Sequence, residues 1–316
     1  MPKTDSAKKR KKKAVGAGGG GRAPGRGGGF AARMVEENPE LRSGSTLGKL
    51  KRRLQRSGRK KEIDGEAFWV VEGDLLLDDD QLAVYADQQD AIAEMVRMKS
   101  DRPGLQGTGL IRPQTVALVG ILQAGKMVRW KPGLVLTYCV LRSTFLNQAQ
   151  YERVRDNVVA ATGAWEGACG IKFEHRPELD GSATTTPPGV VFPVRFFNAG
   201  GAFIAAAFFP DDPTHRRRVL VDPSYFTTSF DPVGVLRHEL GHVLGFRHEH
   251  IRSGAPAVCP AEDTGDTIDL TQYDPQSCMH YFCGGVGSRE LAITQLDRSG
   301  SQRLYGPPLA EFIDVE

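Results

Sequence analysis

The sequence predicts an α+β fold: an upper subdomain with a twisted mixed sheet and one histidine-bearing helix, then a loop-rich lower subdomain after the third histidine. The first observation is residues 238–250, HELGHVLGFRHEH, whose histidines follow the spacing HExxHxxGxxH. The second is a set of short apolar runs before this segment, which are typical of strands. These runs cover residues 134–141, 190–197, 203–209 and 219–221, and an amphipathic stretch at 147–165 predicts a helix beside them.

The histidine helix has two predicted ends. Asp231 and Pro232 predict its start, because aspartate is a favoured N-cap and proline fits the first helical position. Gly245 predicts its end, because glycine adopts the positive φ that closes a helix and turns the chain back. The helix should therefore run for about 13 residues. A second, short helix should begin near the chain end, with Thr294 and Asp297 as a capping box.

The spacing of the histidines indicates a catalytic site for one zinc ion. Residues four apart share a helix face, about 5.4 Å along the axis, so His238 and His242 can bind one metal. The turn at Gly245 can bring His248 to the metal as the third ligand. Catalytic zinc has three protein ligands and one open position for water. Glu239 follows the first ligand and can act on that water as general base.

Two other interpretations of the motif are a helix with surface histidines and a structural zinc site. The chain has only 7 histidines in 316 residues. A chance match to the five fixed positions has odds of roughly 10⁻⁷ per window. Structural zinc sites usually complete their coordination with cysteine or histidine, and no cysteine lies within the motif. The catalytic interpretation is therefore favoured.

The extended motif resembles that of the metzincin zinc peptidases, which carry a Met-turn farther along the chain. Residues 277–281, SCMHY, are similar to the astacin Met-turn SxMHY, and residues 245–249, GFRHE, to the astacin continuation GFxHE. Arg252 matches a further arginine of that family. The resemblance covers about residues 125–306 and implies a zinc metalloendopeptidase of the metzincin fold, most similar to the astacins.

The resemblance also implies roles around the metal. Met279 would form a hydrophobic floor beneath the zinc. Tyr281 would be a fifth, swinging zinc ligand that stabilises the transition state. Glu249 would be a buried acid that meets the mature N-terminus after activation. His250 and His280 are expected to support the site or lie on the surface, without binding the metal.

Residues 71–74, VEGD, resemble the FxGD segment of astacin pro-regions, with valine in place of phenylalanine. In that family the aspartate occupies the open zinc position and keeps the precursor latent. The resemblance therefore makes Asp74 the candidate latency switch. The alternative is a simple turn, since Gly-Asp is common in turns.

Three features depart from the astacin pattern. Residues 253–255, SGA, replace an acidic and basic run, and the four disulfide cysteines of the family have no convincing counterparts. Residues 202–211, AFIAAAFFPD, are more similar to the edge strand of the matrixins. This strand is expected to pair with an extended substrate, although an ordinary core strand would have the same pattern.

Composition divides the chain into three expected regions: a disordered, basic Gly/Lys/Arg-rich head (1–62), a pro-region-like segment (63–120) and a zinc metallopeptidase catalytic domain (121–316). The head has 19 Lys and Arg against 5 Asp and Glu, a net charge of +14, whereas the remainder has a net charge of −11. Such a head can bind nucleic acid or acidic surfaces through counterion release, or it can be a solvated tail. Smaller elements are expected at 49–61 (a short helix or a cleavable linker), 67–77 (a strand) and 80–99 (a helix).

The five cysteines leave at least one thiol unpaired, and Cys259 can pair with Cys278 or Cys283. No stretch approaches 18 apolar residues, so no membrane span is expected. The chain start lacks the apolar run of a signal peptide, whereas the resemblance implies a secreted enzyme. Localisation is therefore left open.

The predicted function is hydrolysis of peptide bonds in protein or peptide substrates by zinc-activated water, from a latent precursor (a zymogen). One alternative is a catalytically silent, metzincin-like binding protein. The other is a protein that binds nucleic acid or acidic surfaces weakly through residues 1–62.

Overall fold

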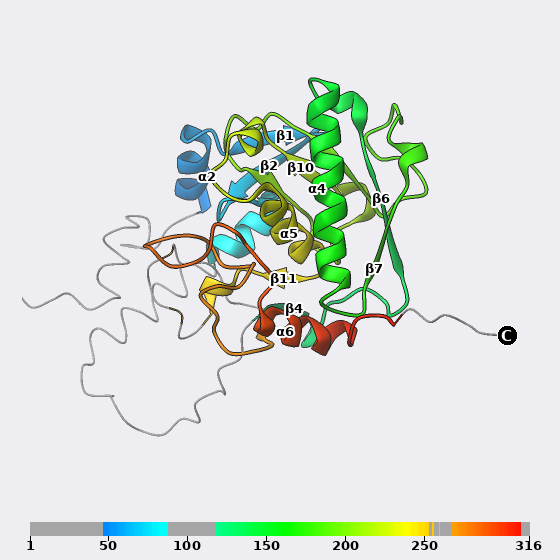
Figure 1. Cartoon of the computed structure of the whole chain (residues 1–316). Helices are drawn as coiled ribbons and strands as arrows, with labels where there is room; N and C mark the ends of the chain where they lie inside the picture. The colour runs from blue at the N-terminus through cyan, green and yellow to red at the C-terminus, as the bar shows by residue number, and fades with distance from the viewer. Residues whose placement is uncertain (1–46, 88–117, 253–254, 256–258, 260–266, 311–316) are drawn as a thin grey trace, which may run out of the picture.

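The structure is a computed structural model that describes residues 47–87, 118–252, 255, 259 and 267–310 (Figure 1). Most of the expected head, residues 1–46, lies outside the described residues, so its disorder and its binding to nucleic acid stay predictions. Of the expected helix at 80–99, the described part is helical from 79 to 87, and the rest also lies outside.

A five-stranded mixed sheet forms the centre of the upper subdomain and confirms the predicted α+β class. Its strands, in spatial order, are β7 (Lys172–His175), β6 (Val135–Val140), β8 (Phe192–Phe196), β10 (Val219–Val221) and β9 (Ala205–Ala206). The first four run parallel, and β9 lies antiparallel to β10 at the edge. The edge position of β9 leaves one side of this strand without a neighbour in the sheet.

Two of these strands differ from the sequence prediction. The expected strand at 203–209 shrinks to the two residues of β9, because β10 is only three residues long and pairs with it through two. Strand β7 was not predicted, because only Phe173 of its four residues is buried. An apolar alternation cannot be recognised in so short a strand.

Two helices pack against each other and join the sheet in one core. Helix α4 (Gln148–Glu166) starts where the Asn147 side chain accepts a hydrogen bond from the Gln150 backbone N–H. Helix α5 (Pro232–Val243) carries the first two motif histidines. Both helices are central in Figure 1. The buried face of α4 is the predicted one, with Tyr151, Val154, Val158 and Trp165. This core therefore holds α5 rigidly beside β9, with which it is in contact.

An N-terminal unit forms a separate antiparallel sheet. It consists of α2 (Leu47–Arg56), β1 (Lys60–Ile63), β2 (Glu66–Val71) and β3 (Leu75–Leu77). The single strand expected at 67–77 is wrong: Glu72 and Gly73 have positive φ and make a turn between β2 and β3. Part of the head expected to be disordered is thus helix and strand, and the expected boundary between residues 62 and 63 falls inside β1.

Strand β2 has both of its faces buried. Trp69 and Val71 pack on Leu50 and Leu54 of α2, in a core of the N-terminal unit itself. On the other face, Phe68 and Val70 join a second core with Ala206 and Leu220 of the large sheet and with Phe203, which precedes β9. Successive side chains of a strand point to opposite faces, so one strand can serve both cores. This strand therefore docks the N-terminal unit on the upper subdomain, beside edge strand β9.

The lower subdomain has little regular structure, as predicted. A small sheet joins β4 (Val119–Gln123) to β5 (Lys126–Met127), β11 (Phe246–Arg247) and β12 (Thr267–Asp269), and helix α6 (Gln295–Tyr305) lies beside it in Figure 1. The predicted capping box of Thr294 and Asp297 starts α6. Single 3-10 turns occur at Arg142–Thr144, Pro177–Leu179, Thr214–Arg216, Pro223–Phe226 and Glu249–Ile251. Among the described residues, no helix is long and apolar enough to cross a membrane.

Candidate metal centre

Helix α5 begins and ends at the residues that the sequence indicates. The Asp231 carboxylate accepts hydrogen bonds from the backbone N–H groups of Val233 and Gly234 at the start. Gly245, with φ of 91°, follows the last turn and reverses the chain into β11. The reversal brings His248 back toward the helix, within reach of His242.

The three motif histidines converge on one point. The Nε2 atoms of His242 and His248 are 3.2 Å apart. The Nδ1 of His238 is 2.7 Å from the Cys278 carbonyl oxygen, and the Nδ1 of His242 is 2.7 Å from the Phe246 carbonyl oxygen. Each of these Nδ1 atoms must carry a proton to donate to its carbonyl. The Nε2 atoms of His238 and His242 are then left with lone pairs, which is the tautomer that binds a metal.

Asp74 completes this cluster from the N-terminal unit. Its Oδ2 lies 3.4 Å from His238 Nε2, 3.9 Å from His242 Nε2 and 3.3 Å from His248 Nε2. All four side chains are buried, and one ligand atom from each lies within 4.8 Å of the others. Three nitrogens and one carboxylate oxygen therefore surround a common centre.

The spacing of these atoms fits a tetrahedral zinc ion. Zinc binds imidazole nitrogen and carboxylate oxygen at about 2.0–2.2 Å, so neighbouring ligand atoms of a tetrahedron are about 3.3–3.6 Å apart. Four of the six separations between these atoms are 3.2 to 3.9 Å, close to this edge length, and the other two are within 4.8 Å. Nitrogen with carboxylate oxygen is also a donor set that zinc accepts. Asp74 takes the fourth position in this arrangement.

Burial and mutual charge set the protonation of the cluster. Burial lowers the pKa of His242 to about 4, so this imidazole is neutral. Burial by itself raises the pKa of Asp74, but its interactions with His248, His238 and His242 outweigh this effect. The net pKa of Asp74 lies well below its usual range, so this group is a carboxylate. A neutral imidazole, as at His242, and an ionised aspartate are forms that bind a metal.

The turn that presents Asp74 is held on both sides. The Tyr281 hydroxyl donates to Asp74 Oδ1 at 2.7 Å. Glu72 accepts a hydrogen bond from Arg247 Nη2 at 3.3 Å, and its Oε2 is 3.8 Å from His248 Nδ1. Sequence reasoning missed Glu72 and Arg247. A signal was available, since a Glu-Gly-Asp turn places two carboxylates at one end of a hairpin.

Glu239 is buried in α5 next to the first ligand. Its Oε2 has no hydrogen-bond partner among the described residues. Burial, and then the negative charge of Asp74, raise the pKa of Glu239 well above its usual value. A buried carboxyl group without a partner is costly unless it serves a function. Glu239 is therefore poised to take up and hold a proton.

The Met-turn lies directly under α5. Met279 is fully buried, and a Cβ on Gly241 would come within 2.3 Å of its sulfur. Only glycine lets the helix and this methionine approach so closely. Asp297 anchors the turn, because its carboxylate accepts hydrogen bonds from the Ser277 hydroxyl and the Cys278 backbone N–H. Met279 thus packs against α5 at Gly241, and its role as a floor beneath the zinc stays a prediction.

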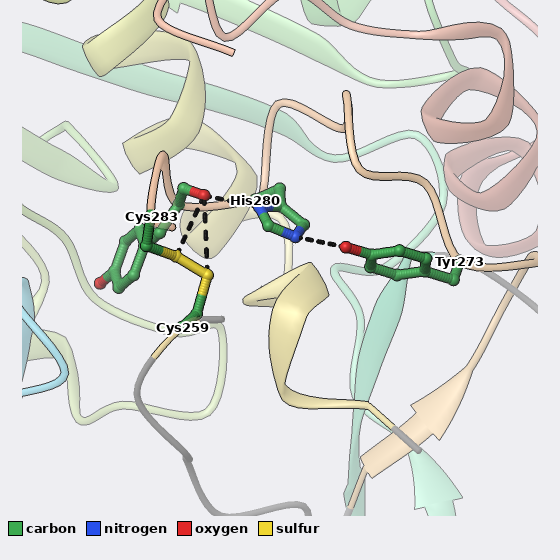
Figure 2. The surroundings of a disulfide bond; sticks show 5 residues. Cys259, Tyr273, His280 and Cys283 are labelled. Atoms are coloured by element: carbon green, nitrogen blue, oxygen red, sulfur yellow. Dashed lines mark hydrogen bonds between the residues drawn. A yellow bond between two sulfur atoms is a disulfide. The ribbon is translucent and has the colours of Figure 1, made fainter. Parts of the chain in front are cut away.

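Figure 2 shows the surroundings of the backbone that carries Tyr281. The Tyr273 hydroxyl is 2.8 Å from His280 Nε2, and His280 Nδ1 is 2.6 Å from the Tyr281 carbonyl oxygen. Burial lowers the pKa of His280 to about 4, so it is neutral. Its Nδ1–H then donates to Tyr281 while its Nε2 accepts from Tyr273. His280 supports Tyr281 and lies outside the four-residue cluster, and His250 is also buried outside it.

A disulfide joins Cys259 to Cys283, one of the two pairings that the sequence allows, with a Cα separation of 5.2 Å. Both sulfurs face the Tyr281 carbonyl oxygen, at 3.9 and 3.5 Å (Figure 2). These are contacts and not hydrogen bonds, because a disulfide sulfur carries no proton. Cys139, Cys169 and Cys278 are buried free thiols. The disulfide thus borders the backbone at Tyr281.

Glu249 is buried behind the third histidine. Its two oxygens accept hydrogen bonds from the backbone N–H of Leu118, the backbone N–H of Asp274 and the Arg252 guanidinium. Burial raises the pKa of Glu249 to about 8, against the lowering effect of Arg252. The group that Glu249 meets near the start of β4 is thus a peptide N–H. The meeting of Glu249 with a mature N-terminus stays a prediction.

The sequence matches no protein-family model and no curated protein. Among solved structures, the chain is similar to that of myroilysin, with 19% identity and a TM-score of 0.41, over 56% of this chain and 95% of that one. It is also similar to high choriolytic enzyme 1 of the medaka fish Oryzias latipes, a hatching enzyme zinc-protease. That match has 18% identity and a TM-score of 0.39, over 57% of this chain and 94% of the other. Similarity at this level transfers no activity, so the function has to be argued from the side chains.

Proposed function

We propose that this chain is a zinc-dependent endopeptidase of the metzincin type, most similar to the astacins, and that it is made as a latent precursor. The observation that carries the proposal is the convergence of three imidazole nitrogens and one carboxylate at zinc-like separations, with Glu239 buried beside them. A silent binding protein would have no need of a buried glutamate whose Oε2 lacks a hydrogen-bond partner among the described residues. The geometry therefore favours catalysis over mere metal binding.

His238, His242 and His248 would hold one zinc ion. When bound, zinc polarises the scissile carbonyl and makes a water molecule nucleophilic at neutral pH. Glu239 would accept the proton of that water at its carboxylate and transfer it to the leaving amine nitrogen. Its Oε2 has no hydrogen-bond partner among the described residues, so this oxygen is available to take up the proton.

Tyr281 would stabilise the oxyanion that forms on the scissile carbonyl. Its hydroxyl already donates to a carboxylate oxygen at the fourth position, 2.7 Å from Asp74 Oδ1. An oxyanion in the same place would receive the same hydrogen bond. Edge strand β9 would pair with the substrate backbone, which must lie extended to pass the site. This role fits its place at the sheet edge, close to α5.

Asp74 would keep the precursor latent by occupying the fourth position. The unit that carries it is docked by ion pairs as well as by β2. Arg195 pairs with Asp64, Arg216 pairs with Glu66 and Asp78, and Arg247 pairs with Glu72. A substrate carbonyl cannot reach the centre while this carboxylate is there. Activation would therefore require the turn at 72–74 to leave.

The test of the proposal is Glu239→Gln in the full chain, with zinc content and casein hydrolysis measured together. Glutamine keeps the size of the side chain but cannot take up a proton. We expect one zinc per chain in both proteins, hydrolysis by the parent after limited trypsin nicking, and none by the variant. A variant that hydrolyses casein as fast as the parent would contradict the proposed base, and a parent without zinc would contradict the proposed metal centre.

A further inference from the structure

We infer that the face of the large sheet on which the N-terminal unit packs is a docking site for acidic segments of other proteins, built around Arg195 and Arg218. Its ligand is an extended segment that presents two acidic side chains and then an aromatic one. The site opens when the N-terminal unit leaves, so the inference rests on the proposed latency. It concerns a surface apart from the metal centre.

The two arginines lie on the side of the sheet that faces away from α5. In β10, Val219 and Val221 pack in the main core with α5, whereas Leu220 between them belongs to the second core, with β2. Leu220 is the register partner of Arg195 in β8, and Arg218 lies two residues before Leu220. Successive side chains of a strand point to opposite faces, so these three residues share one face. Figure 1 shows β1 and β2 beside β10, where the N-terminal unit covers this face.

Among the described residues, every ion pair of the arginines on this face goes to the N-terminal part of the chain. Arg195 and Arg218 share the carboxylate of Asp64, at 2.5 and 3.7 Å. Arg216, at the rim, pairs with Glu66 at 2.8 Å and with a second acid of the same part of the chain. The large sheet thus supplies the cations and the covering unit supplies the acids, although the chain after residue 62 is acidic as a whole.

Asp64 does not satisfy the two inner arginines completely. Arg195 is 6% exposed and Arg218 is 4% exposed, and the Nε of each has no hydrogen-bond partner among the described residues. Burial lowers the pKa of both guanidinium groups, and the negative charge of Asp64 opposes this effect. A guanidinium group binds carboxylate oxygens through several N–H donors at once. A ligand with more carboxylate oxygens than Asp64 alone therefore has donors to bind here.

Phe68 indicates the second property of the ligand. The guanidinium groups of Arg216 and Arg218 lie over its ring, at 5.4 and 5.0 Å from the centroid. A cation over an aromatic face is attracted by the charge distribution of the ring. Asp64, Glu66 and Phe68 contact the arginines at intervals of two residues, which is the spacing of side chains on one face of an extended segment. This spacing, with an aromatic contact, favours an acidic peptide over a nucleic acid.

The experiment uses the full chain with three substitutions that weaken the hold of the N-terminal unit on this face, Asp64→Asn, Phe68→Ser and Val70→Ser. Glu239→Gln is present throughout, so that no peptide is cleaved. Reaction of Arg218 with phenylglyoxal, located by mass spectrometry, reports whether the site is open. We expect protection in the parent and modification in the variant. The trypsin-nicked parent is a second open form, in case the variant does not fold, and protection of Arg218 in both forms would overturn the inference.

Fluorescence anisotropy then measures the binding of two labelled peptides to the open form. One has the sequence of residues 62–68, EIDGEAF, and the other, EINGQAF, replaces two acids with amides of the same shape. We expect the acidic peptide to bind at least about tenfold more tightly, and this difference to shrink at high salt. Equal binding of the two peptides, or no binding of either, would overturn the inference. A short single-stranded DNA that binds more tightly than EIDGEAF would indicate a general polyanion site and would also overturn it.

A matched pair of variants assigns the binding to this face. Arg195→Gln should lower the affinity for EIDGEAF at least about tenfold and leave that for EINGQAF unchanged. Arg153→Gln is the control, since Arg153 is an exposed arginine of α4, which packs on the other face of the sheet. Arg216→Gln, at the partly exposed rim, should have a smaller effect and replaces Arg195→Gln if that variant does not fold. Unchanged affinity for EIDGEAF would place the peptide elsewhere and refute the site.

These measurements separate the docking site from the proposed function, because they record binding and not hydrolysis. A chain that takes up no zinc or hydrolyses nothing contradicts the peptidase proposal, while the two peptides still decide whether the arginines bind acids. A chain that hydrolyses casein after nicking but binds both peptides equally contradicts the docking site alone.

Discussion

Helix α5 and the pair Asp74–Tyr281 both contribute to the same centre, but they reach it in different ways. His238, Glu239 and His242 lie within five consecutive residues, and the geometry of one helical turn places them together. Asp74 and Tyr281 are 207 residues apart and meet through a hydrogen bond of 2.7 Å. Helix geometry places the first group, whereas the packing of the N-terminal unit against the rest of the chain places the second.

This difference separates permanent from removable parts of the site. Helix α5 packs in the main core through Val235, Leu236, Leu240 and Val243, so this core places its histidines. Asp74 keeps its position only while β2 and the ion pairs hold its unit in place. The proposed metal ligands on α5 are therefore placed by the main core, whereas Asp74 is placed by the N-terminal unit.

The largest loss of activity is expected from a substitution in helix α5. His242→Ala removes a ligand that is 1% exposed and leaves a cavity where the metal would lie. Zinc contributes several kcal/mol to the reaction, so its loss lowers activity by at least about a thousandfold. Zinc content by atomic absorption should fall together with peptide hydrolysis. Full zinc occupancy in this variant would show that α5 is not the permanent part of the centre.

Tyr281→Phe tests the distant partner and should have a smaller effect. Loss of one oxyanion donor typically lowers kcat by about 10²-fold. Zinc content should not change, because the three histidines remain. The assay is best done with Asp74→Asn present, so that release of Asp74 cannot mask the loss. A variant as active as its parent would remove Tyr281 from the catalytic group.

Asp74→Asn should act in the opposite direction and raise the activity of the uncleaved chain. The amide keeps the shape of the side chain but loses the charge that the histidines stabilise. If only about 1.4 kcal/mol of this contact is lost, the open fraction rises about tenfold. The rate of peptide hydrolysis without trypsin measures this increase. Asp80→Asn is the control, because Asp80 is an exposed residue in the same N-terminal part of the chain. Equal rates for both variants would argue against a latency switch.

Asp231→Ala should have the smallest effect. It removes the N-cap of α5 and with it two hydrogen bonds to backbone N–H groups. Such a loss typically costs about 1 kcal/mol of unfolding free energy. The melting temperature should fall slightly while zinc content and the rate at 25 °C stay the same, because the core holds the helix. A large loss of zinc would show that the ligands depend on the cap.

The parts of the molecule that depend on short-range rules could be predicted from the sequence. The limits of α5, the buried face of α4 and the capping box of α6 each follow from residues a few positions apart. The length of β9 and the existence of β7 could not be predicted, because both depend on partner strands far away in the chain. At the site, the contact between Glu72 and Arg247 could not be predicted either, because it forms only where the N-terminal unit packs against the rest of the chain.

The double burial of β2 has a consequence for how this molecule would be switched on. A protease that cuts the chain between residues 87 and 118 would break no contact of Phe68 or Val70, so the severed piece would stay bound as a separate polypeptide. Cleavage and release would then be two events with different kinetics. Dilution, or a competing strand that covers Ala206 and Leu220, would drive the second event.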